Sequence, residues 1–146
     1  MWREVFYENI EIIEQGLDRP ICSAVYFLAQ FIGEAENGGI EQYIYNDSGN
    51  NFFALLSMCS AIDCPKLTDL LIEIKETFAF TEEHAERASR NTQVESLESV
   101  ADVDLFEPLE QSFIESQFDI ETCIDKYYQM VKIELESMGE IIGQPR

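Results

Sequence analysis

The stretch PICSAVYFLAQFIGEAENGG, residues 20–39, decides the fold class. Pro20 suits the first turn of a helix, where the missing N–H leaves no hydrogen bond unmade. The residues that follow are apolar almost all round a helical circumference, which is typical of a helix enclosed by others. Asn37-Gly38-Gly39 then ends the pattern, because glycine accepts the left-handed conformation found after a helix. We therefore expect a buried central helix over residues 20–36.

Stretches on both sides of this segment also show the three- to four-residue apolar spacing of helices. Asp119 is the expected N-cap of the last helix. Residues 81–104 are polar, and there we expect weak helix near Val94 and otherwise solvated surface or linker. No stretch shows sustained strand-like alternation between turn signals. The chain is thus predicted to be all-α, a single compact bundle of about six or seven helices in one domain, residues 1–146. The flanking helices are expected at residues 2–17, 40–44, 52–62, 67–78, 105–118 and 119–138.

Charge is the most unusual property of the chain. Its 146 residues include 29 acidic and 9 basic side chains, for a formal net charge of −20. Nucleic acid and anionic membrane surfaces would be repelled, whereas a basic protein would be attracted. The apolar content of 46% is too high for a disordered acidic tail. No apolar run approaches the ~20 residues of a membrane span. We therefore expect a protein partner, no nucleic acid and no membrane.

The cysteines and the N-terminus predict a cytoplasmic protein. Residues 1–5 contain no basic segment followed by an apolar run, so no secretory signal is expected. The four cysteines form no Cys-x-x-Cys pair, and most lie among apolar residues at helical spacing. We expect buried free thiols and no disulfide framework. The cysteines are Cys22, Cys59, Cys64 and Cys123.

No pattern of residues indicates catalysis. His84 is the only histidine, and it lies in a polar run where we expect it to be exposed. A structural zinc site needs about four closely spaced Cys or His ligands, and a helical di-iron site needs paired Glu-x-x-His motifs. Nucleophilic catalysis needs a base beside the nucleophile. The expectation is therefore no catalytic residue, no metal and no cofactor. An unrecognised carboxylate enzyme is the weakest alternative, and it would need two convergent buried carboxylates in an apolar pocket.

Two sets of acidic residues are candidates for binding a basic partner. One DNA strand places a charge about every 3.4 Å along its axis. Carboxylates three or four residues apart on a helix lie about 4.5–6 Å apart, so two neighbouring stripes approach the charge density of one strand. The alternative is a solvated face that serves solubility. The first candidate set comprises Glu95, Glu98, Asp102, Asp104, Glu107, Glu110, Glu115, Asp119 and Glu121. The second is a stripe on the first expected helix, formed by Glu4, Glu8, Glu11, Glu14 and Asp18.

Residues 37–49, NGGIEQYIYNDSG, resemble the signature of a bacterial family of DNA mimic proteins. These are small acidic helical domains, mostly without an assigned function. The resemblance implies a protein that occupies the DNA-binding surface of a dimeric helix-turn-helix transcription factor and keeps that factor off its operator. Ile40 and Ile44 stand where the family more often has aromatic residues. The signature positions look structural, with Gln42 or Asn46 satisfying backbone groups. They include neither candidate acidic set.

Two functions therefore follow from the sequence. The first is a DNA mimic that regulates transcription by covering the DNA-binding surface of a transcription factor. The alternative is an immunity or antitoxin-like module that neutralises a basic toxin or nuclease. Both act through the acidic surface, and they differ only in the class of protein that is bound.

Overall fold

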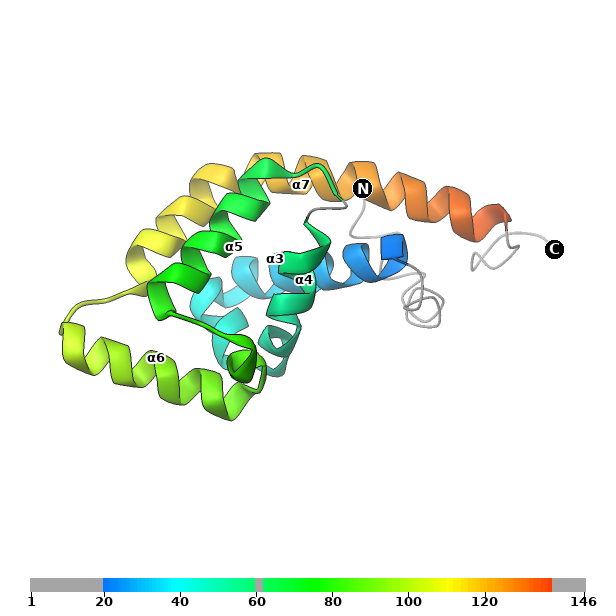
Figure 1. The fold of residues 1–146 in the computed structure, drawn as a ribbon. Helices are drawn as coiled ribbons and strands as arrows, with labels where there is room; N and C mark the ends of the chain where they lie inside the picture. The colour runs from blue at the N-terminus through cyan, green and yellow to red at the C-terminus, as the bar shows by residue number, and fades with distance from the viewer. Residues whose placement is uncertain (1–19, 60–61, 138–146) are drawn as a thin grey trace.

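The computed structural model describes residues 20–59 and 62–137, and within those ranges it contains helices and no strand (Figure 1). The all-α prediction is confirmed there. The helix expected at residues 2–17, together with its acidic stripe, lies outside the described residues. The elements are α3 (Pro20–Tyr45), the 3-10 turn η1 (Asp47–Asn51), α4 (Phe52–Met58), α5 (Pro65–Phe78), the 3-10 turn η2 (Glu82–Ala85), α6 (Arg87–Ala101) and α7 (Phe106–Ser137).

The Gly38-Gly39 pair breaks α3 into two helical parts, as the sequence predicts. Gly38 has φ −144° and ψ 17°, and Gly39 has φ 83° and ψ 176°, a conformation open to glycine alone. The chain then resumes a helix that ends at Tyr45. Close approach also demands glycine, since a Cβ at Gly39 would lie 2.8 Å from both carboxylate oxygens of Glu110. The break thus redirects α3 and brings it against α7.

The described residues form five α-helices, where six or seven were expected for the whole chain. One difference is α7, a continuous helix of 32 residues in place of two shorter ones. The prediction that Asp119 caps a helix is wrong, because that residue is exposed in the middle of α7. No proline or glycine follows Pro108 within α7, so nothing interrupts its backbone hydrogen bonding.

The segment expected to be mostly surface or linker forms α6, a helix of 15 residues. Its own residues have little apolar periodicity, so local pattern gave only a weak signal. Val94 and Arg90 are both fully buried, and they attach the helix to the rest of the fold. Tertiary contact therefore stabilises a helix that its sequence alone would leave marginal.

The core lies between α3, α5 and α7. Helix α3 packs against α4, α6 and α7, while α5 packs against α7. In Figure 1, α7 runs along one side of the molecule and α6 lies on the opposite side. Aromatic rings fill the junctions, with the Phe31 and Phe113 centroids 6.1 Å apart and those of Phe78 and Phe106 4.9 Å apart. The aromatic content of the sequence thus serves helix packing.

The expectation of free thiols is wrong for two of the cysteines. Cys64, directly before α5, forms a disulfide with Cys123 of α7, and their Cα atoms are 5.9 Å apart. The two residues are 59 positions apart in sequence, so no local spacing could indicate the pairing. The uninterrupted course of α7 carries Cys123 across the start of α5. Cys59 is free and buried, as predicted.

None of the helices within residues 20–59 and 62–137 has the length and apolar content that crossing a bilayer requires.

Candidate functional site

His84 is buried, which corrects the prediction that it is exposed. Only 7% of the residue is accessible. Its Nδ1 accepts a hydrogen bond from the backbone N–H of Thr81 at 2.9 Å. Its ring lies 5.5 Å from that of Phe80, centroid to centroid. The histidine side chain therefore caps the start of η2. Its neighbours in sequence are polar, so the sequence did not indicate the contact with Phe80 that buries it.

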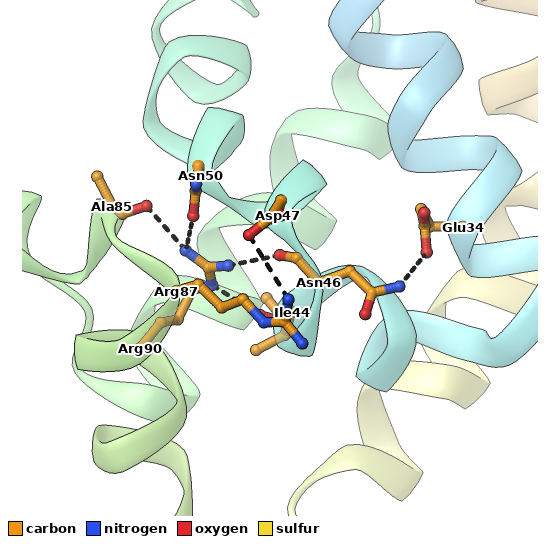
Figure 2. A network of polar contacts seen from close by, with 8 residues as sticks. All are labelled: Glu34, Ile44, Asn46, Asp47, Asn50, Ala85, Arg87 and Arg90. Carbon is orange, nitrogen blue, oxygen red and sulfur yellow. Dashed lines mark hydrogen bonds and ion pairs between the residues drawn. The ribbon is translucent and has the colours of Figure 1, made fainter.

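The second half of the 37–49 signature surrounds a buried guanidinium. Arg90 of α6 has no exposed surface. Figure 2 shows its side chain reaching from α6 to the end of α3 and to η1. The guanidinium donates to the Ile44 and Asn46 carbonyls at 2.7 Å and to the Asn50 side chain at 3.0 Å. It also donates to the carbonyls of residues 84 and 85 at 3.3 and 2.9 Å. Arg90 thereby joins α6, η1, η2 and α3.

Gly49 is required at this junction because the guanidinium lies against it. A Cβ at Gly49 would come within 2.6 Å of the Tyr43 carbonyl oxygen and 2.7 Å of Arg90 Nη2. Burial lowers the pKa of Arg90. Arginine nevertheless remains charged in proteins, and here the surrounding carbonyl oxygens solvate that charge.

Two side-chain amides of the signature bind a carboxylate. The side chains of Gln42 and Asn46 donate to Glu34 at 2.7 and 3.0 Å. They therefore bind a side chain, and the prediction that they satisfy backbone groups is wrong for these two contacts. Glu34 and Gln42 also line a polar pocket of about 430 Å³. Glu34 is the only carboxylate among the residues that line this pocket.

Carboxylates from α6, from the turn before α7 and from α7 gather around Glu41 of α3. Burial raises the pKa of Glu41, and the negative charges of Glu98, Asp104 and Glu110 raise it further. Glu41 lies in α3 beyond the glycine break, Glu98 in α6, Asp104 in the turn before α7, and Glu110 in α7. The three other carboxylates are therefore close enough to Glu41 for their charges to oppose its ionisation.

Tyr45 places a further carboxylate in the same group. Burial raises the pKa of its hydroxyl, and the negative charges of Glu98, Glu95 and Glu41 raise that pKa further. We name Glu41, Glu95, Glu98, Asp104 and Glu110 the acidic cluster. Four of its five members come from the first candidate set, whereas sequence analysis missed Glu41. The only sequence signal for Glu41 was its place two residues after the glycine pair.

Two members of the acidic cluster are positioned by helix ends. Asp104 accepts the backbone N–H of Phe106 at 2.9 Å and so caps the start of α7. Glu110 accepts the N–H of Glu41 at 3.1 Å, where α3 resumes after its break. Carboxylates are favoured at helix N-termini by the free N–H groups there. The same contacts that build the fold thus bring the negative charges together.

The other members of the first candidate set lie along α6, the following turn and α7. Asp102 has φ 52° and ends α6 in a left-handed conformation. Glu107 is exposed in the first turn of α7, Glu115 is exposed and accepts from Gln111 at 3.2 Å, and Glu121 is half-buried. Their role in binding a partner remains a prediction.

Few basic residues lie near the acidic cluster in the sequence. No lysine or arginine occurs in residues 91–125 or in residues 20–65. Among the described residues, no ion pair involves the acidic cluster; the contacts there include Arg87 with Asp47 at 3.6 Å, Lys132 with Glu136 at 4.0 Å, and the His84 ring with Glu83 at 3.6 Å. Residues 20–59 and 62–137 also contain no group of three or more His, Cys, Asp or Glu arranged to hold a metal ion. The arrangement is suited to attracting basic side chains.

Comparison with known families places the chain. A family described as DMP19-like protein matches residues 19–132, which include the signature and all five members of the acidic cluster. A search of curated proteins and a search of solved structures each found no match. The resemblance to the DNA mimic family, seen at the signature, is thus confirmed over most of the sequence, and the chain belongs to the DMP19-like protein family.

Proposed function

We propose that this protein is a DNA mimic: it binds the DNA-binding surface of a transcription factor through its acidic face and blocks access of that factor to DNA. The partner is a DNA-binding protein, in the first instance a dimeric helix-turn-helix transcription factor. The protein acts by occupying a surface and catalyses nothing. Membership of the DMP19-like family supports this function.

The observation that carries the proposal is the gathering of carboxylates from α3, α6 and the start of α7 around Glu41 and Tyr45. Burial is the largest cause of the raised pKa of Glu41, and nearby negative charges raise that pKa further. Phosphates along DNA stand in a similar field of like charge, which is relieved when lysine or arginine side chains approach. A basic surface evolved to neutralise phosphates would therefore gain comparable energy from these carboxylates. A dispersed set of surface acids, in contrast, would not form a focused negative field.

The spacing of the carboxylates also fits this interpretation. A single helical stripe is sparser than a DNA strand, because its charges lie about 4.5–6 Å apart and those of a strand about 3.4 Å. Here α3, α6 and the start of α7 each contribute to the acidic cluster, so more than one row meets there. Added rows bring the local charge density toward that of a strand.

Capture from a lysate of the native cell, at low and at high salt, tests the proposal. The tagged full-length chain is incubated with the lysate, and captured proteins are identified by mass spectrometry. Electrostatic attachment predicts a transcription factor retained at low salt and lost at high salt. The captured factor is then mixed with its own operator DNA and the protein. Mimicry predicts that DNA and protein exclude each other in a gel-shift assay.

Matched variants separate local charge from total charge. The test variant is Glu95→Gln, Glu98→Gln and Glu107→Gln. The control is Asp69→Asn, Glu76→Gln and Glu82→Gln, which removes the same number of negative charges at exposed positions elsewhere. The proposal expects the test variant alone to lose the factor. Equal loss in both variants, or retention of many unrelated basic proteins, would reduce the acidic face to a solvated surface. Capture of a toxin or nuclease that the protein inhibits would favour the immunity alternative.

A further inference from the structure

The outer face of α7 carries apolar side chains between two acidic pairs. Glu107, Glu110, Ile114, Phe118 and Glu121 follow one another at steps of three, four, four and three, and Asp125 continues the row four residues later. Such steps place side chains along one face of a helix. Leu109, Phe113, Ile120 and Ile124 are buried on the opposite face. The row therefore lies on another face of α7 from these buried residues, and we name it the 107–125 row. Its members Glu110 and Glu121 are half-buried, and the other four are exposed.

Two large apolar side chains are exposed in the middle of this row. Ile114 is 63% exposed and Phe118 is 80% exposed. They are four residues apart, so they adjoin and form one patch. Burying a phenylalanine is favourable, and a face that served only solubility would carry polar residues at both positions. A partner that covers this patch would gain the favourable free energy of burying these two side chains.

We propose that the 107–125 row docks a helix of the partner protein whose own face carries apolar residues between lysine or arginine residues at both ends. The inference rests on the proposed function and names the chemistry of its partner. The charge of the row favours a basic partner helix, because acidic residues lie at both ends of the row and no lysine or arginine occurs in residues 91–125. Along a helix the row spans about 27 Å, which matches a partner helix of about 18 residues.

Two other occupants, a second copy of this chain and its residues 1–19, carry charge of the wrong sign. A second copy of this chain would set the acids of one α7 against those of another, and like charges opposed across an interface weaken it. Residues 1–19 of the same chain contain five acidic residues, Glu4, Glu8, Glu11, Glu14 and Asp18, and only two basic ones, Arg3 and Arg19. A basic helix gains from both parts of the row, because its cations meet the carboxylates and its apolar residues cover Ile114 and Phe118.

Two synthetic helical peptides, each as long as the row, test the proposal. Both carry lysines in their first and last turns. One has leucines at two central positions four residues apart, and the other has glutamines at those positions. Binding to the full-length protein is measured by calorimetry at low salt. The leucine peptide is expected to bind about tenfold more tightly, since its leucines cover the patch.

Variants identify the surface that makes the difference. Ile114→Gln with Phe118→Gln is expected to abolish the tenfold preference while leaving affinity for the glutamine peptide unchanged. Ile72→Gln, at an apolar side chain of α5 that is 39% exposed, is the control and keeps the preference. Both positions of the double variant are exposed, and far-ultraviolet circular dichroism confirms that its helices remain.

The outcomes distinguish this inference from the function on which it rests. Equal affinity for the two peptides would overturn the docking of an apolar helix face and leave charge mimicry standing. No binding of either peptide at low salt would count against both. A preference that survives in the double variant would place the apolar contact elsewhere on the molecule. Self-association of the chain that the double variant abolishes would assign the patch to a second copy and overturn the proposal.

Discussion

Arg90→Met removes the guanidinium that joins α6 to the end of α3, and we expect it to destabilise the fold by about 4 kcal/mol. Five hydrogen bonds disappear, four of them to backbone carbonyl oxygens. Hydrogen bonds to a charged group contribute about 1.5–3 kcal/mol each, while burying the charge opposes folding by several kcal/mol. Methionine fills much of the volume but leaves the carbonyls without a donor, at about 1–3 kcal/mol each where water cannot enter.

Arg87→Met is the matched control for this substitution. The Arg87 side chain is 51% exposed and pairs with an Asp47 side chain that is 81% exposed. Exposed pairs contribute at most about 1 kcal/mol. The two variants therefore remove the same charge from the same helix, one from the interior and one from the surface.

Urea unfolding followed by circular dichroism measures both variants. The reasoning predicts a large fall in the free energy of unfolding for Arg90→Met and little change for Arg87→Met. Because Arg90 also places α6, its loss should separate Glu98 from Glu41 and bring the pKa of Glu41 closer to its ordinary value. A variant at position 90 within about 1 kcal/mol of the wild type would refute the account of this junction.

Four further outcomes follow from the structure. Since the folded-state pKa of Glu41 is raised above its ordinary 4.5, its protonation adds stability that is fully present below that value and is lost as pH rises through the raised pKa. The melting temperature should thus fall as the pH rises above 4.5 and through the raised pKa at constant ionic strength, less so in Glu41→Gln, and an equal pH dependence in the two proteins would contradict this. Gly49→Ala should lower the urea-derived free energy of unfolding by about 2 kcal/mol through overpacking against Arg90, and a neutral result would mean that the turn yields easily. Cys64→Ser with Cys123→Ser opens a loop of 59 residues and should lower that free energy by about 4 kcal/mol, whereas a melting temperature insensitive to reductant would count against a stabilising bridge. Moderate salt should raise the melting temperature by screening the net charge of −20, and a fall would indicate that the acids are already compensated.

The family and the helical class were accessible from local pattern. Apolar spacing in residues 20–36 and the glycine break at Gly38-Gly39 depend on neighbours along the chain, so a reader of the sequence can find them. The signature identified the family for the same reason. The structural reason for the signature residues could not be predicted from the sequence. Gly49, for example, is required by the guanidinium of Arg90, 41 positions later in the sequence.

Predictions failed where distant contacts decide the outcome. Helix α6 has a weak pattern of its own, and buried Arg90 and Val94 hold it in place. His84 has mostly polar neighbours in the sequence, yet its ring packs on Phe80. The Cys64–Cys123 bridge spans 59 positions. Each depends on which surfaces meet after folding, and residue spacing along one element does not contain that information.

The acidic character of this protein was determined by its sequence alone, since net charge is a sum over residues and does not depend on their arrangement. Which carboxylates become neighbours was decided only by tertiary structure. Glu41 joins Glu98 and Glu110 because α3 breaks at Gly39, α6 is held by Arg90, and α7 begins beside both. Electrostatic interaction falls with distance and is screened by water and salt, so the packing of helices turns a total charge into a local field.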